Sequence, residues 1–280
     1  MTRKTQVVKD LKFSFFLLCI MLVFCLLMMA IVRRCYLRNV VKREQIEVTV
    51  RAGSTLLEVA KNLEDLGIVS KTDFISACGS ERFKKYEFIN NIPKVREKYF
   101  KLEGYLFPDT YMFFKDESVF SVIDKFLGNF SKKLEIIEEF LVNSQFDLDE
   151  ILTIASILQR ECDVESATGV ASVMYNRLST LPEGKSEFGE FGMNRLQSDP
   201  TVYYPYKNQN SAPDGFISKY DTYSISGLPP GAICSPELDF IIAALKPEKT
   251  NFYYFVTSPE GKAFFARTYQ EHKENFKKLR

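Results

Sequence analysis

The sequence is poor in histidine and tryptophan: its 280 residues include one histidine, His272, and no tryptophan. A Ser-His-Asp hydrolase needs a histidine as its general base, and a histidine-rich metal site needs several. His272 stands among charged residues near the C-terminus, where an exposed or helix-capping role is the plainest interpretation. No phosphate-binding loop or glycine-rich dinucleotide motif follows a predicted strand. The sequence therefore disfavours histidine-based and nucleotide chemistry, and we expect neither a metal nor an organic cofactor.

A strong net charge is also missing. The chain carries 37 basic and 36 acidic residues, which gives a formal net charge of +1. A basic excess is the usual sign of nucleic-acid binding, so we expect no nucleic-acid partner. The six cysteines form no CxxC pair, and a zinc or redox motif is therefore not predicted. A disulfide between Cys78 and Cys234 is left open.

One long apolar run lies near the N-terminus. Residues 13–32 carry no charged side chain, and about 20 apolar residues are enough for a helix to cross a bilayer. The run lacks a small-x-small cleavage site, so we predict an uncleaved single-pass anchor. Lysine and arginine flank the run on both sides in similar number. The positive-inside rule therefore does not decide its orientation.

A small module is predicted directly after the anchor. Residues 46–50 alternate in polarity like a strand, and a helix over 55–66 follows, with Ser54 as its expected cap. A second short helix is expected after Ser70. Two interpretations stay open: a packing or spacer unit, or a glycan-binding module whose outline is similar to a LysM-like domain. Residues 81–101 have no clear period and are predicted to form a linker.

The chain contains one apolar helix that ends in a carboxylate. Asp147 and Glu150 have the spacing of a capping box, which predicts a helix start at Asp147. Helical spacing places the Glu161 carboxylate on the apolar face of this helix, together with Ile151, Ile154 and Leu158. Further helices are expected over 118–140, 166–178 and 236–244, with a terminal hairpin of strands over 252–256 and 263–267.

The carboxylate of Glu161 has two interpretations. It can be a structural partner of an arginine, such as Arg177 or Arg195. Alternatively it can be a general acid, because burial among apolar side chains raises the pKa of a carboxyl group and keeps it protonated near neutral pH. An ordinary glycosidase needs a second carboxylate at a set distance. The spacing leaves open whether Asp199 or Glu103 comes near enough.

Six sequence blocks, in this order along the chain, resemble the YceG-like family, the endolytic murein transglycosylases of the MltG type. The blocks span most of the chain after the apolar run, roughly residues 45 to 276. They are LEGYLFPDTY at 102–111, ASILQRE at 155–161, ASVMYNRL at 171–178, LQSDPTVYY at 196–204, YDTYSISGLPPGAICSP at 220–236 and YYFV at 253–256.

The resemblance implies an α+β fold with an N-terminal transmembrane helix, a small LysM-like module and a larger mixed α+β catalytic domain. The expected organisation is a cytoplasmic tail (1–12), the membrane helix (13–32), a linker (33–45), the LysM-like module (46–95) and the transglycosylase domain (96–280). The N-terminus is expected in the cytoplasm and the catalytic domain outside the cytoplasmic membrane. Glycan strands of peptidoglycan are the implied substrate, and murein synthases are implied partners.

The resemblance also implies a reaction and its site. The family's catalytic glutamate ends the ASILQRE block, which places it at Glu161. It would cleave the β-1,4 bond between N-acetylmuramic acid and N-acetylglucosamine without water and leave a 1,6-anhydro end. The polar residues of the other blocks are expected to position the sugars or Glu161: Glu103, Asn176, Gln197, Asp199 and Tyr220.

The chain departs from the family pattern at several places. The loop between Leu178 and Met193 is longer than in relatives, Asp221 stands where many have asparagine, and Ala263 stands where a histidine often precedes the hairpin phenylalanine. His272 matches a later family histidine. These changes concern substrate contacts. Two rival functions are a non-catalytic glycan-binding scaffold and a hydrolase in which Asp199 holds a water.

Overall fold

The protein consists of two compact units, residues 1–45 and 46–280, in a computed structural model. The structure describes residues 3–42, 44–94, 97–179, 194–206 and 208–279. The predicted α+β class is confirmed, since both helices and short paired strands are present. The predicted boundary at residue 95 stays a prediction, and residues 46–280 form one unit.

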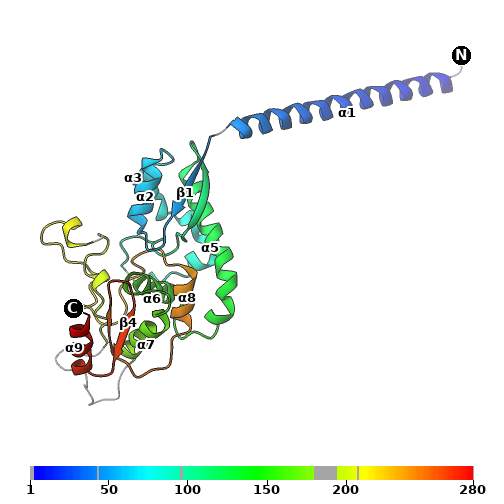
Figure 1. The fold of residues 1–280 in the computed structure, drawn as a ribbon. Coiled ribbons are helices and arrows are strands. Elements are labelled where there is room, and N and C mark those ends of the chain that lie inside the picture. The colour runs from blue at the N-terminus through cyan, green and yellow to red at the C-terminus, as the bar shows by residue number, and fades with distance from the viewer. Residues whose placement is uncertain (1–2, 43, 95–96, 180–193, 207, 280) are drawn as a thin grey trace. The chain divides into compact units, whose positions relative to one another are not determined.

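The first unit is dominated by one long helix, α1 (Arg3–Lys42) (Figure 1). Its segment Phe15–Leu37 has a mean hydropathy of 3.2 and is long and apolar enough to cross a membrane, by length and composition alone. The linker over 33–45 stays a prediction, and its first part is helical because α1 continues to Lys42. No glycine or proline occurs in this stretch to interrupt the backbone hydrogen bonds.

The second unit begins with β1 (Gln45–Val50), α2 (Leu56–Asp65) and α3 (Lys71–Cys78). The predicted cap of α2 is one residue off: Thr55 is the N-cap, and it forms a reciprocal capping box with Glu58. Ser70 caps α3 as predicted. Strand β1 pairs with β2 (Asp109–Phe114), which lies on the far side of the predicted boundary at residue 95.

The segment predicted as a linker is partly helical. It contains the 3-10 helix η1 (Glu81–Lys85) and the short helix α4 (Glu87–Asn90), in which Phe83 and Ile89 are buried. Single turns of helix are too short to produce a hydrophobic period, so the pattern gave no sign of them. The segment therefore joins the core rather than connecting two bodies.

Four helices form the centre of the second unit: α5 (Val119–Leu141), α6 (Leu148–Glu161), α7 (Ala167–Leu178) and α8 (Leu238–Leu245). Helix α6 packs against both α7 and α8. Every residue from Ile151 to Leu158 is buried, so α6 is enclosed on all sides along its middle. The buried middle of α6 therefore fixes the position of its last residue, Glu161.

The C-terminal part forms a small hairpin and a final helix. Strand β3 (Tyr254–Thr257) pairs antiparallel with β4 (Ala263–Ala266), and α9 (Tyr269–Lys278) follows. Two 3-10 turns, η2 (Asp199–Thr201) and η3 (Gln209–Ser211), interrupt the long segment before α8. Turn η2 contacts α6, which brings the block 196–204 against the helix that ends in Glu161.

Candidate active site

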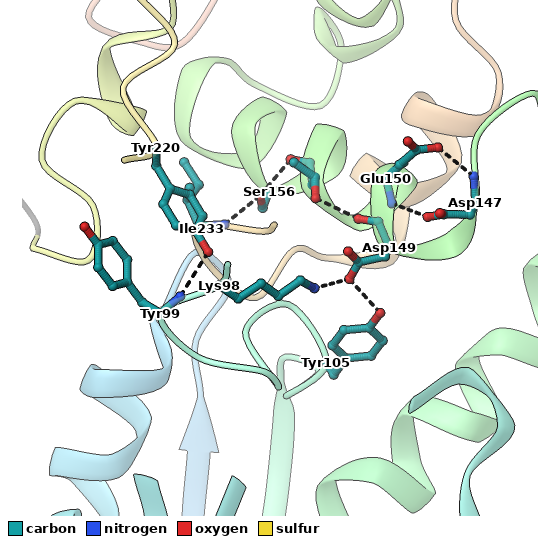
Figure 2. Close-up of polar contacts among 10 residues, drawn as sticks. Lys98, Tyr99, Tyr105, Asp147, Asp149, Glu150, Ser156, Tyr220 and Ile233 are labelled. Carbon is teal, nitrogen blue, oxygen red and sulfur yellow. Dashed lines mark hydrogen bonds and ion pairs between the residues drawn. The ribbon is translucent and has the colours of Figure 1, made fainter. Parts of the chain in front are cut away.

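Helix α6 is anchored at its start by its cap and by a buried ion pair (Figure 2). Asp147 and Glu150 form the predicted capping box. The ammonium of Lys98 contacts the carboxylate of Asp149, and both side chains are about 5% exposed or less. The Tyr105 hydroxyl donates to the same carboxylate at 2.9 Å. These contacts fix the N-terminal half of α6 to the segment 98–105.

A chain of hydroxyl groups continues along α6. The Thr153 hydroxyl donates to the Asp149 carbonyl at 2.7 Å, and the Ser156 hydroxyl donates to the Thr153 carbonyl at 2.8 Å. The Ser156 oxygen in turn accepts from the Ile233 amide at 2.9 Å, which ties the loop before α8 to the helix (Figure 2). Buried polar groups of this kind are stable only when they are paired, so they define one position for α6.

Glu161 is the last residue of α6 and is partly buried. Burial raises the pKa of its carboxyl group to about 7. The Ser198 hydroxyl donates to Oε1 of Glu161 and lowers this pKa, as does the charge of Arg177, whereas the charge of Asp199 raises it. A carboxyl group with a pKa near 7 can both give and take a proton at neutral pH.

The two arginines proposed as ion-pair partners are engaged elsewhere. The Arg177 guanidinium donates to the carbonyls of Tyr253, at 2.8 Å, and of Leu196. The Arg195 guanidinium donates to the carbonyl of Tyr223 at 3.0 Å. Among the described residues, no ion pair within 4.0 Å includes Glu161. The interpretation of Glu161 as one half of a structural ion pair is therefore not supported.

Ser198 is held in place by two buried threonines. Its amide donates to the Thr222 hydroxyl at 2.8 Å, and the Thr201 hydroxyl donates to the Ser198 carbonyl at 2.6 Å. The two threonine hydroxyls share a hydrogen bond of 2.9 Å. All three side chains are buried. This hydroxyl cluster (Ser198, Thr201 and Thr222) aims the Ser198 hydroxyl at Glu161 and leaves Oε2 of the carboxyl group for other contacts.

Arg177 supplies a half-buried positive charge near the Glu161 carboxyl group. Burial lowers the pKa of its guanidinium to about 10, while the nearby Glu161, Tyr223 and Tyr254 oppose that decrease. The guanidinium also lies over the ring of Phe255, 5.7 Å from its centre. Arg177 is therefore protonated at neutral pH and stabilises negative charge at Glu161.

Asp199 directly follows Ser198 in the chain, and its side chain is exposed. Its carboxylate accepts a hydrogen bond of 2.5 Å from the Tyr223 hydroxyl. Burial raises the pKa of Tyr223, and the adjacent carboxylate of Asp199 adds to the increase, so the phenol keeps its proton. The structure therefore brings Asp199 close enough to Glu161 for its charge to raise the pKa of that carboxyl group, a point that the sequence left open.

Gln197 directly precedes Ser198 in the chain. Its backbone has φ of +53°, a conformation that costs energy in residues other than glycine. Its amide donates to the Thr222 carbonyl at 3.2 Å. The side chain is half-buried. A strained backbone beside Ser198 is consistent with a functional position, and sugar contact by Gln197 stays a prediction.

Three predicted site residues take part in internal contacts. Both carboxylate oxygens of Glu103 accept from the Leu56 amide, and one accepts from the Tyr204 hydroxyl at 2.8 Å. The Asn176 amide group donates to the carbonyls of Thr250 and Phe252. These bonds give Glu103 and Asn176 structural tasks, and their predicted contacts with sugar stay predictions.

Tyr220, the third of these residues, is fully buried. Its hydroxyl accepts from the Tyr99 amide at 3.4 Å, and the two rings stack with their centres 5.3 Å apart (Figure 2). This arrangement ties the block 220–236 to the segment before α5. A sugar contact by the Tyr220 side chain stays a prediction.

Sequence reasoning missed Ser198, Thr222 and Tyr223 as members of the site. All three lie inside the blocks that carry the resemblance, next to residues that were singled out. Their partners are 24 to 37 positions away in sequence, and no local pattern reports such a contact. The useful signal in the sequence was that polar blocks flank an apolar helix. This pattern predicts that polar side chains gather near the end of the helix, but it does not identify which of them are in contact.

His272 and the cysteines belong to no metal-binding cluster among the described residues. The His272 ring is half-buried and stacks on Tyr254 with the ring centres 5.6 Å apart, and burial lowers the pKa of the imidazole. Cys78 and Cys234 are buried free thiols. In the part of the chain that the structure describes, no three His, Cys, Asp or Glu side chains gather as a metal site would require.

Two similar proteins of known name are both endolytic murein transglycosylases. The chain is 32% identical over 239 residues to an endolytic murein transglycosylase of Bacillus subtilis (strain 168), covering 81% of this chain and 63% of that protein. It is also 32% identical over 188 residues to an endolytic murein transglycosylase of Streptococcus pneumoniae (strain R6), covering 63% of this chain and 32% of that protein. The chain thus spans less than two thirds of the length of these relatives.

A solved structure and a family model agree with these relatives. The fold is similar to the crystal structure of a YceG-like protein from Listeria monocytogenes, with a TM-score of 0.66 and 27% identity over 82% of this chain and 75% of that one. The model of the YceG-like family matches residues 29–278, which include α6, the hydroxyl cluster and the terminal hairpin. On this match, the chain belongs to the YceG-like family.

Proposed function

We propose that this protein is a membrane-anchored lytic transglycosylase that cuts murein glycan strands internally. The observation that carries the proposal is Glu161, a carboxyl group with a pKa of about 7 at the end of a buried helix, with one oxygen fixed by Ser198. The names of the relatives from Bacillus subtilis and Streptococcus pneumoniae support the substrate class.

In the proposed reaction, Glu161 acts first as an acid and then as a base. Its carboxyl proton moves to the oxygen that links N-acetylmuramic acid to N-acetylglucosamine, and the bond from C1 to that oxygen breaks. The 6-hydroxyl oxygen of the same muramoyl sugar forms a new bond to C1, and its proton passes to the Glu161 carboxylate. The product is a 1,6-anhydro end, the enzyme returns to its starting protonation state, and no water is consumed.

The surroundings of Glu161 suit both halves of this cycle. Burial favours the protonated acid that the first half requires. The Ser198 hydroxyl and the Arg177 charge stabilise the carboxylate that exists between the two proton transfers. We assign Oε2, the oxygen that Ser198 does not bond, as the atom that exchanges the proton.

The membrane and partner assignments follow the same resemblance. We propose that the segment Phe15–Leu37 of α1 is a single-pass anchor, with a cytoplasmic N-terminus and with residues 46–280 outside the cytoplasmic membrane. Murein synthases are expected partners, and the LysM-like character of residues 46–95 is part of the same proposal.

The test is product analysis with isotopic water. The full chain in detergent is incubated with purified murein in H₂¹⁸O, and the products are read by mass spectrometry. We expect anhydromuramoyl ends without ¹⁸O, and a rate about 10²- to 10⁴-fold lower for Glu161→Gln. Reducing ends that contain ¹⁸O would indicate a hydrolase in which Asp199 holds the water. Equal product from the wild type and Glu161→Gln would contradict the proposal, and absence of product from the wild type would favour a scaffold.

A further inference from the structure

A polar groove of about 710 Å³ lies between β1, α2 and the last turn of α6. This volume falls within the roughly 300–1,000 Å³ that is typical of small-ligand sites. The polar lining comes from the exposed side of β1, the turn after it, one stripe of α2 and two residues of α6. Its residues are Glu47, Thr49, Arg51, Ser54, Glu58, Asn62, Gln159 and Arg160. No function assigned above uses this groove.

The groove is held at a set position relative to Glu161. Gln159 and Arg160 line it, and they are the two residues that directly precede Glu161 on α6. The Arg160 guanidinium donates to the Gly53 carbonyl at 3.3 Å, and the Gly53 amide donates to the Ser235 carbonyl at 2.9 Å. Gly53 has φ of +73°, so the turn that makes these bonds requires glycine.

Among the residues that the structure describes, the lining carries charges of both signs and no aromatic ring. Arg51 and Arg160 are cationic, and Glu47 and Glu58 are anionic. The Glu58 carboxylate is already bonded to the Thr55 amide in the capping box, whereas Glu47 and Arg51 are exposed. A groove without an aromatic face offers little to a neutral sugar ring. Charges of both signs match a short peptide that has free carboxylates and a free amino group.

We propose that this groove binds the peptide stem of murein. The proposal rests on the proposed function, because it concerns the sugar that Glu161 would cut. The stem is attached to the same N-acetylmuramic acid whose C1 reacts, so a stem site has to begin within about one sugar of the acid. Gln159 and Arg160 place the groove within one helical turn of Glu161, on another side of α6, so the stem would pass the C-terminal end of α6 to reach it.

The direct test is peptide binding to the full chain in detergent. The probe is L-Ala-γ-D-Glu-L-Lys-D-Ala with fluorescein on its N-terminus, the end that would be joined to the sugar, and the readout is fluorescence anisotropy. We expect Arg51→Ala to weaken binding about three- to tenfold because it removes one charge-assisted contact, and Arg51→Lys to recover part of the loss. Added salt should weaken binding by the wild type.

Two further variants make the result specific. Lys132 is an exposed lysine on α5 outside the groove, and Lys132→Ala should bind as the wild type does. Glu161→Gln should also bind as the wild type does, because the stem contacts the groove and not the acid. Equal binding by Arg51→Ala and the wild type, or no wild-type binding at millimolar peptide, would overturn the proposal.

A second measurement separates this proposal from the proposed function. Anhydro product is followed with strands that keep their stems and with strands from which an amidase has removed them. We expect Arg51→Ala to raise KM about three- to tenfold for the first substrate and to leave the second unchanged. An equal rise on both substrates would overturn the stem proposal. If the wild type forms no product from either substrate, the proposed function fails, and the binding measurement still decides the groove.

Discussion

Burial raises the pKa of two carboxyl groups to about 7, that of the partly buried Glu161 and that of the fully buried Glu103. Glu103 is enclosed, and its oxygens accept from the Leu56 amide and the Tyr204 hydroxyl. Glu161 is partly exposed, and its carboxylate accepts a hydrogen bond from the Ser198 hydroxyl. A raised pKa is therefore no proof of catalysis, and access together with neighbouring charge separates the structural carboxyl group from the candidate acid.

The Ser198 hydroxyl is predicted to set the pH range of activity. The wild type should lose activity as the pH rises through about 7, because Glu161 must be protonated to act as the acid. Ser198→Ala removes a bond that lowers the pKa of Glu161, so the alkaline limb should move to higher pH, and kcat should decrease about tenfold because the carboxyl group is no longer oriented. Initial rates of anhydro product between pH 5 and pH 9 test both effects.

Ser235→Ala is the matched control for that variant. Ser235 is another buried serine, and in the described part of the chain its hydroxyl has no hydrogen-bond partner. Its removal should leave the pH profile unchanged. A profile for Ser198→Ala that overlays the wild type would refute the orienting role of Ser198.

Glu103 is predicted to make the fold less stable as the pH rises. Between pH 4.5 and about 7 the unfolded chain releases this proton and the folded chain keeps it, so the free energy of unfolding should decrease by about 3 kcal/mol across this window. Glu161 contributes in the same direction. Glu103→Gln should therefore show a smaller decrease. Urea unfolding of residues 46–280 at pH 5 and pH 7.5 measures it, and an unchanged pH dependence would contradict the prediction.

At the scale of elements, α6 was the most predictable part of the chain. Its start, its capping box and its apolar positions follow from spacing within one helix, and all three are confirmed. Short elements were less predictable. Helix α2 uses Thr55 in place of Ser54 as its cap, and α8 begins at Leu238 in place of Pro236, because several polar residues near a helix start can serve and tertiary contacts select one.

The fold is predicted to depend on both members of the buried ion pair at the start of α6, because removing one leaves the other charge buried. Asp149→Ala would leave the Lys98 ammonium buried without this carboxylate, and the free energy of unfolding should decrease by about 3–5 kcal/mol. Asp147→Ala, two residues away on the same helix, removes only a cap and should cost about 1 kcal/mol. Urea unfolding of both variants tests the difference, and equal losses would argue against a special role for the ion pair.

At the scale of the whole molecule, the chain divides after Gln45 into an apolar helical unit and a folded unit. The described side chains of Phe15–Leu37 are exposed, which a long apolar helix tolerates only when lipid or another apolar partner surrounds it. This division matches the sequence pattern, although α1 extends beyond the predicted run at both ends.

Membrane association is therefore predicted to reside in α1. The full chain should stay in the membrane pellet after extraction with alkaline carbonate, and a chain that begins at Ile46 should remain in the supernatant. Immunoblots of the two fractions provide the measurement. Release of the full chain by carbonate would show that the apolar segment does not span the bilayer.

The sequence by itself determined the elements whose signals are local: the apolar span, the capped helix α6 and the family blocks around it. It also predicted that Glu161 is the carboxylate of interest, because helical spacing and the absence of a suitable histidine are both properties of the chain alone. Only the tertiary structure decided which polar residues meet. It joined the Ser198 hydroxyl to Glu161 and the Glu103 carboxylate to the first amide of α2, and it formed the charged groove beside α6. These contacts join positions 37 to more than 100 residues apart, and long-range packing, which no local period encodes, brings them together.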